Sequence, residues 1–210
     1  MAAPREPSPR SQAKTKVAAP ALPEIGFRTI AAWSAWLAKH HASSPGFWMR
    51  IARKTSRTPS ISYAEALEVA LAWGWIDGQK ARGDAEAWLQ KFTPRSPRSV
   101  WSQINVAKAN ALIARGEMQP AGLVAVERAK QSGAWDRAYA SPSKVEVPAD
   151  FLAALAARPP AQRFFEQLES ANRYAILFRI HTAKRPETRA RRIAALADLC
   201  ARGERLHAPK

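Results

Sequence analysis

The carboxylate with the most distinctive setting in the sequence is Asp77, which stands between apolar residues in the stretch Trp75-Ile-Asp-Gly-Gln-Lys80. A carboxylate in such a place can act as a general acid or base if a partner group approaches it. If the protein is an enzyme, its site would lie in a possible pocket between two modules, near Asp77, Lys80, Trp101 and Asn105, although no acid/base pair is evident among them. A turn-forming Asp77, or one paired with Lys80 or a nearby arginine, is the simpler explanation.

Motifs that mark known enzyme classes do not occur in the sequence. It contains no Gly-x-Ser-x-Gly nucleophile elbow and no Walker loop. The pair His40–His41 has no further ligands at metal-binding spacing, and a predicted helix ends there, where the helix dipole favours cationic side chains. We therefore predict no catalytic residues, no metal and no cofactor, and we favour a binding protein over an enzyme.

The densest basic stretch covers residues 183–192, where Pro186 predicts the start of the last helix. Lys184 and Arg185 stand at this helix start, where the helix dipole disfavours cations by about 0.3–1 kcal/mol. Free backbone N–H groups at a helix start bind anions, and arginine adds a bidentate fork. We hypothesise that Lys184, Arg185 and Arg189 gather a phosphate, a carboxylate or an acidic side chain of the protein itself.

The remainder of the last helix has an ordinary amphipathic pattern. Helical periodicity places Ala190, Ile193, Leu196, Ala197 and Cys200 on its apolar face. Two carboxylate–arginine pairs at a spacing of four residues, Glu187–Arg191 and Asp198–Arg202, predict solvated ion pairs on the opposite face. Arg189 lies at the edge of the apolar face, so these pairs do not explain it.

The composition points to a globular, strongly basic protein. The chain has 210 residues, 47% of them hydrophobic, with a formal net charge of +16 and a pI of about 10.9. Such a charge favours nucleic acid, an acidic protein, a small anion or an anionic membrane surface as partner, although a basic composition without a specific partner is also common. The sequence does not indicate an oligomeric state.

Aromatic and basic residues are interleaved in the first half of the chain. The tryptophans concerned are Trp48, Trp73, Trp75, Trp88 and Trp101, and the basic residues are Arg50, Arg53, Lys80, Lys91, Arg95 and Arg98. Together they could form a stacking platform for nucleic acid. Their apolar neighbours favour the alternative, in which the tryptophans belong to the hydrophobic core.

Periodicity and breakers predict a mainly α fold with a small antiparallel β-sheet in the N-terminal half. Residues 1–22 read as a disordered basic tail, and residues 23–140 as an α+β module. Within that module we expect strands over residues 46–53, 75–80 and 87–93, and helices over residues 29–41 and 101–114, with a capping box at Ser62–Glu65 and a further helix starting at Pro120. A linker over residues 141–148 precedes a helical module over residues 149–205.

Cellular location is inferred from what the sequence lacks. Cys200 is its single cysteine, which excludes a disulfide framework within the chain and fits a reducing compartment. The first 16 residues contain no apolar signal-peptide core, and no stretch approaches the roughly 18 apolar residues of a membrane span. We expect a cytoplasmic protein.

Several longer stretches resemble a known family. They are Trp73–Lys80, Phe92–Arg95, Ser99–Asn105, Met118–Gly122 and Thr182–Arg192. They are similar to the YdeI/OmpD-associated family, also called bacteriocin-protection proteins, over about residues 27–204. The resemblance implies a stress-response role in tolerance to bacteriocins or antimicrobial peptides, with an OmpD-associated-type module at residues 149–205, and it carries over no catalytic residues. A protein of charge +16 does not attract cationic peptides, so we expect an anionic partner.

Overall fold

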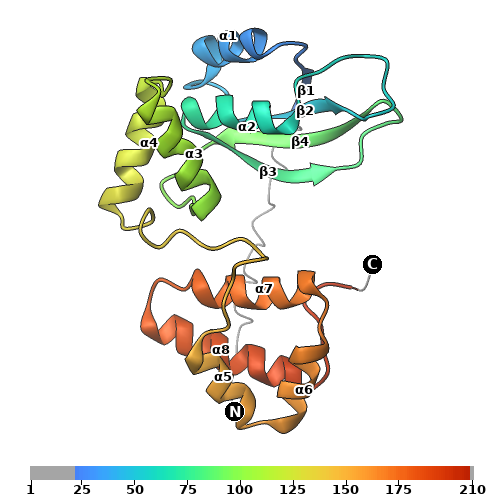
Figure 1. Cartoon of the computed structure of the whole chain (residues 1–210), viewed down its shortest axis with the longest axis vertical. Coiled ribbons are helices and arrows are strands. Elements are labelled where there is room, and N and C mark those ends of the chain that lie inside the picture. Colours follow the sequence, from blue (N-terminus) through green and yellow to red (C-terminus); the bar gives the residue numbers. More distant parts are fainter. Residues whose placement is uncertain (1–21, 209–210) are drawn as a thin grey trace, which may run out of the picture.

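The computed structural model describes residues 22–208, which form eight helices and four strands in two modules (Figure 1). The mainly helical fold class with a small sheet in the N-terminal half is confirmed. The predicted tail lies outside the described residues, apart from Leu22. Hydrophobic clusters gather separately on either side of the linker, while the module boundaries themselves stay a prediction.

The sheet of the N-terminal module has four strands in the order β1-β2-β4-β3. Their bounds are Glu24–Gly26 for β1, Phe47–Ala52 for β2, Trp75–Ala81 for β3 and Ala87–Pro94 for β4. Strand β4 pairs antiparallel with both β2 and β3, as expected. Strand β1 pairs parallel with β2, so the sheet is mixed. Three residues are too few to show a period of two, which is why β1 was not predicted.

Four helices complete this module. They are α1 (Ile30–His40), α2 (Tyr63–Ala72), α3 (Gln103–Ala114) and α4 (Pro120–Gln131). The predicted capping box is formed, because Ser62 and Glu65 each accept a hydrogen bond from the other's backbone N–H. Helices α1 and α2 cover one face of the sheet and bury an aromatic core that includes Trp33, Phe47 and Trp75 (Figure 1).

The orientation of α3 differs from the prediction. Helical spacing predicts one apolar side that carries Ile104, Ala107, Ala111 and Leu112, but Ile104 is 53% exposed, and Ala107 and Ala111 are exposed too. The buried side instead carries Asn105, Ala109 and Leu112, in line with the buried Trp101. Alanines make several sides of α3 about equally apolar, so burial of the large Trp101 ring decides which side faces the core.

The C-terminal module consists of four helices around one core. They are α5 (Ala149–Ala156), α6 (Pro159–Gln167), α7 (Ser170–His181) and α8 (Pro186–Ala201). Helix α8 starts at Pro186 as predicted and packs against α5, α6 and α7. The predicted apolar face of α8 is buried at Ile193, Leu196, Ala197 and Cys200, whereas Ala190 is exposed.

Neither predicted ion pair of α8 is formed among residues 22–208, since no salt bridge joins Glu187 to Arg191 or Asp198 to Arg202. Asp198 pairs instead with Arg158 (3.0 Å), which precedes α6, and Arg202 pairs with Glu204 (2.7 Å). An ion pair at a spacing of four residues stabilises a helix by only about 0.2–0.5 kcal/mol. Other charged partners that the fold, or the turn after the helix, brings close can therefore replace it. No helix within residues 22–208 is long and apolar enough to cross a membrane.

Candidate functional site

The two modules meet through Tyr139, which belongs to a segment fastened to the start of α3. Its backbone N–H donates to the carbonyl oxygen of Trp101 (3.0 Å), and its carbonyl oxygen accepts from the N–H of Gln103 (2.9 Å). The Tyr139 ring packs edge-on against Phe178 of α7, with centroids 4.9 Å apart and an angle of 86°. Tyr139 therefore ties the N-terminal module to α7.

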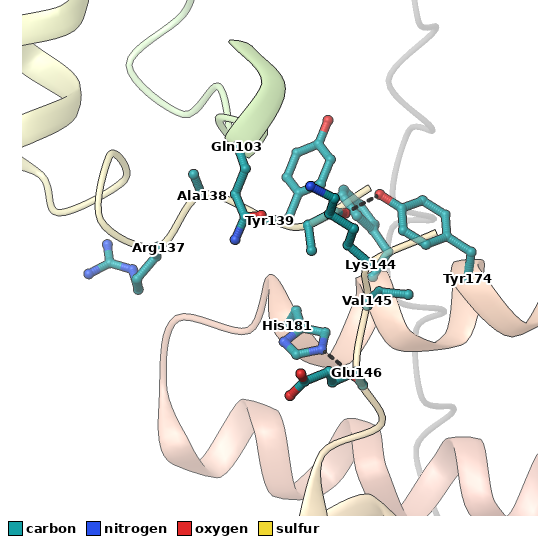
Figure 2. A pocket seen from close by; sticks show the side chains of 11 residues that line it. Gln103, Arg137, Ala138, Tyr139, Lys144, Val145, Glu146, Tyr174 and His181 are labelled. Carbon is teal, nitrogen blue, oxygen red and sulfur yellow. Dashed lines mark hydrogen bonds between the residues drawn. The ribbon is translucent and has the colours of Figure 1, made fainter. Parts of the chain in front are cut away.

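Two side chains of α7 also contact backbone carbonyl oxygens, one just before the linker and one within it. The Tyr174 hydroxyl donates to the carbonyl oxygen of Ala140 (3.2 Å), and Nε2 of His181 lies 3.2 Å from the carbonyl oxygen of Glu146 (Figure 2). Figure 1 shows α7 on the side of the C-terminal module that faces the N-terminal module. Side chains of one helix thus set the course of the chain between the modules.

A cavity of about 470 Å³ opens between the N-terminal module, the linker and α7. We call it the inter-module groove. Its polar and aromatic lining includes Gln103, Arg137, Tyr139, Lys144, Glu146, Tyr174, Phe178 and His181 (Figure 2). Arg137 and Lys144 bring two positive charges to the groove and Glu146 brings one negative charge. The lining therefore carries a net positive charge even with His181 neutral.

A narrow extension of about 30 Å³ adjoins the groove. It shares Arg137, Tyr139 and His181 with the groove and adds Trp101 and Lys184. Trp101 and Lys184 come from the two separate sets of residues that the sequence singled out. The structure brings these two together and adds a third cation, Lys184, at the end of the groove.

The other members of the first set lie elsewhere. Asp77 on β3 accepts a hydrogen bond from the Tyr63 hydroxyl (2.7 Å). The Lys80 ammonium lies 4.2 Å from the Trp88 ring centroid. Asn105 is buried in α3, and its backbone N–H donates to the Ser102 hydroxyl. None of these three predicted residues lines the groove.

The Tyr63 hydroxyl, which contacts Asp77, has a raised pKa. Burial raises the pKa of the Tyr63 hydroxyl, and its hydrogen bond to the Asp77 carboxylate raises this pKa further. The hydroxyl therefore stays protonated and serves as a fixed donor to Asp77. The contact makes Asp77 a hydrogen-bonded partner within the N-terminal module.

Arg189 contacts an acidic side chain of the protein. Its Nε and Nη2 atoms donate to the two carboxylate oxygens of Asp150 at 2.7 and 2.9 Å, and Nη1 donates to the carbonyl oxygen of Ile180. The Arg189 guanidinium lowers the pKa of the Asp150 carboxyl. Of the anions proposed for Arg189, the structure shows the internal one. Arg185 is exposed as the N-cap of α8 and does not line the groove.

Arg95, one of the basic residues considered for the stacking platform, is buried and contacts Trp101. Arg95 is only 7% exposed, and its guanidinium stacks on the Trp101 ring at 3.6 Å. Nη1 donates to the carbonyl oxygen of Val100, whereas Nε and Nη2 have no hydrogen-bond partner among residues 22–208. Burial lowers the pKa of Arg95 to about 10, so the side chain is still charged at neutral pH.

Sequence reasoning missed most of the groove. Arg137, Lys144 and Tyr139 lie in or beside the segment interpreted as a linker, where no periodicity marks them. Tyr174 and Phe178 lie four residues apart in α7, and this spacing is a signal that could have indicated one aromatic side of a helix. The tryptophans proposed as a stacking platform are not exposed: Trp75 and Trp101 are buried and Trp48, Trp73 and Trp88 are half-buried, which fits their assignment to the core.

Comparison with known families separates the chain into two parts. Residues 144–203 match the family model described as bacteriocin-protection, YdeI or OmpD-associated. The C-terminal module is therefore the part of the chain that is similar to this family. Residues 25–125 match a different model, a domain of unknown function, DUF8412. No significant match to the chain was found among curated proteins or among solved structures.

The two matches divide the motifs on which the resemblance was based. Only Thr182–Arg192 lies within the YdeI/OmpD-associated module, and the four earlier stretches lie within the DUF8412 match. The range matched to the YdeI/OmpD-associated family supplies Lys144, Glu146, Tyr174, Phe178 and His181 to the groove. Arg137 and Tyr139 lie between the two matched ranges. The groove is thus built where the two matched parts of the chain are joined.

Proposed function

We propose that this protein binds an anionic ligand in the inter-module groove, in a role associated with bacteriocin protection. The match of residues 144–203 to the YdeI/OmpD-associated family suggests that role. The observation that carries the proposal is the convergence of Arg137, Lys144 and Lys184 on two neighbouring cavities between the modules, which share Arg137, Tyr139 and His181 in their linings. Arg137 and Lys144 come from the segment in and beside the linker, Lys184 comes from the turn before α8, and each of the three residues is exposed.

The partners of these cations support the proposal. Arg137 donates to the backbone carbonyl oxygen of Ser132 (2.8 Å), which is a neutral acceptor. Among residues 22–208, neither Arg137, Lys144 nor Lys184 forms a salt bridge. A ligand carboxylate or phosphate would supply the missing counter-charge, since charge-assisted hydrogen bonds are roughly twice as strong as neutral ones.

Binding without turnover fits the lining best. The main groove contains one histidine, and no serine, threonine or cysteine stands beside it among the described lining residues. A nucleophile and a base within hydrogen-bond reach are the usual signature of covalent catalysis. The net charge of +16 also disfavours the cationic peptides themselves as ligands, so protection would operate through an anionic partner.

Titration calorimetry of the full chain with inorganic phosphate at low ionic strength tests the proposal. The Arg137→Ala/Lys144→Ala double variant should bind phosphate at least ~10-fold more weakly, because hydrogen bonds to charged groups contribute about 1.5–3 kcal/mol each. The matched control is Lys39→Ala/Arg163→Ala, which removes the same charges from exposed positions on α1 and α6. An equal loss in both double variants would mean that phosphate responds only to net charge, and the proposal would be wrong.

A further inference from the structure

We infer that the groove takes a phosphate ester that carries an aromatic heterocycle, the chemistry of a mononucleotide. This inference rests on the proposed function and specifies its ligand. Its starting point is size: a cavity of about 470 Å³ lies within the range of about 300–1,000 Å³ that is typical of small-molecule sites. An inorganic anion at the cations would leave most of this space, and the aromatic wall, without a partner.

The aromatic wall consists of Tyr139, Tyr174 and Phe178. Tyr139 meets Phe178 edge-on, and the Tyr174 and Phe178 centroids are 6.0 Å apart at 43°. All three rings are half-buried, so each keeps part of its surface accessible. Nucleobases stack favourably on aromatic side chains, because every base has a planar π-face. A planar ring is therefore the ligand group that gains most from this wall.

The polar residues around the rings suit a heterocycle rather than a plain hydrocarbon ring. Gln103 comes from the start of α3 and offers an amide that both donates and accepts, and Glu146 comes from the linker and offers a carboxylate that accepts. Figure 2 shows Gln103 on the side of the N-terminal module and Glu146 near His181 on the opposite side. Nucleobase edges present both donors and acceptors, which these two side chains complement.

The cations occupy the remainder of the lining. Arg137 lines both the groove and its narrow extension, Lys144 lines the groove, and Lys184 lies in the extension. An ester phosphate near Arg137 would lie in the same cavity as the aromatic wall, because Arg137 and the three rings all line the groove. One ligand with a ring and a phosphate thus fits both features, whereas two unconnected ligands would each use only one.

The test compares ligands that differ by one part, using calorimetry on the full chain. The phosphate-bearing probes are inorganic phosphate, ribose 5-phosphate and the four mononucleotides AMP, GMP, CMP and UMP, and adenosine provides the ring without the phosphate. At least one mononucleotide should bind ~10-fold or more tightly than ribose 5-phosphate, and AMP should bind more tightly than adenosine.

The outcomes separate this inference from the proposed function. If ribose 5-phosphate binds as tightly as every mononucleotide, and Arg137→Ala/Lys144→Ala weakens both, the anion site stands and the aromatic ligand is wrong. If no phosphate-bearing probe binds, both proposals fail. If adenosine binds as tightly as AMP, the phosphate contributes nothing and the inferred ligand class is also wrong.

A ring-deleting variant tests the wall directly. Phe178→Leu should reduce the ratio of the mononucleotide affinity to the ribose 5-phosphate affinity toward one, because both ligands would lose the support of the groove but only the mononucleotide would lose a stacking partner. Tyr174→Leu serves the same purpose should the first variant not fold. The matched control is Phe164→Leu, which removes a half-buried ring from α6, outside the groove. Retention of the full mononucleotide advantage in a folded Phe178→Leu or Tyr174→Leu protein would contradict the inference.

Discussion

The start of α8 and the inter-module groove both gather positive charge, but different groups face that charge. At α8, Arg189 forms a bidentate ion pair with Asp150, so its charge is matched within the protein. In the groove, Arg137 and Lys144 form no salt bridge within residues 22–208. The α8 stretch is the denser one in sequence, yet the groove is the better candidate site.

The difference shows that counter-charge, rather than charge density, distinguishes a structural arginine from a binding one. A cation paired within the fold has its geometry and its hydrogen bonds already assigned. An exposed cation at a concave, partly aromatic surface has its hydrogen bonds available to a ligand. Lys184 belongs to both regions, because it is part of the basic stretch before α8 and also lines the extension of the groove.

The largest expected effect concerns Trp101, which lies in a hydrophobic cluster and also at the edge of the groove. Trp101→Ala should lower the free energy of unfolding by about 3–5 kcal/mol, because it removes a ring that is only 3% exposed and packs against Trp135 and Arg95. Urea denaturation measures this, with Trp101→Phe as the milder control. A loss below about 1 kcal/mol would indicate that Trp101 is not a core residue.

Arg95 is buried and incompletely hydrogen-bonded, whereas Arg189 is paired with Asp150. Arg95→Met should leave the free energy of unfolding unchanged or raise it by up to about 2 kcal/mol, because it replaces a buried, incompletely hydrogen-bonded charge with an apolar side chain. Thermal and urea denaturation of the variant check this. A clear loss of stability would show that the stacking on Trp101 and the bond to Val100 outweigh the cost of burying the charge.

The Arg189–Asp150 pair should have a smaller effect, with a specific pH dependence. Asp150→Asn is expected to lower the free energy of unfolding by about 0.5–1 kcal/mol at neutral pH, since the pair is partly exposed. Arg189 lowers the pKa of Asp150 in the folded protein, so the folded state releases this proton more readily than the unfolded chain. The contribution is present above the ordinary carboxyl pKa of about 3.9 and is lost as pH falls through the lower folded value.

Denaturation of wild type and Asp150→Asn between pH 7 and pH 2 measures this dependence. The two curves of stability against pH should converge at the acidic end. The control is Asp198→Asn, which alters another exposed ion pair, with Arg158. A difference between wild type and Asp150→Asn that stayed constant down to pH 2 would mean that the Asp150 charge does not contribute through Arg189.

The smallest effect on stability is expected from a substitution of Lys184, because the proposed role of Lys184 is in ligand binding alone. Lys184→Ala should change the free energy of unfolding by less than about 0.5 kcal/mol, as for most surface substitutions. It should nevertheless weaken phosphate binding a few-fold, whereas the neighbouring Arg185→Ala should not, because Arg185 does not line the cavities. Equal effects of the two variants on affinity would remove Lys184 from the site.

Local signals in the sequence predicted the elements well and the site only in part. The capping box at Ser62 and the helix start at Pro186 depend on neighbouring residues, and both occur as predicted. The partner of Arg189 is 39 residues away at Asp150, and the partners of Asp198 and Arg202 were also misassigned. Such pairings depend on how helices pack, which periodicity does not specify. Lys184 and Trp101 were singled out, but only the fold shows that they share a cavity.

The separate cores on either side of the linker have a thermodynamic consequence. The C-terminal cluster contains Phe151, Ile176 and Leu196, and the clusters of the N-terminal module share none of these residues. Each module can therefore melt as its own cooperative unit, joined to the other mainly through Tyr139 and the linker. A ligand in the groove would bind only when both modules are folded. In differential scanning calorimetry, ligand binding should bring the separate unfolding transitions of the two modules together into one transition. This change would report occupancy of the groove without any assay of biological activity.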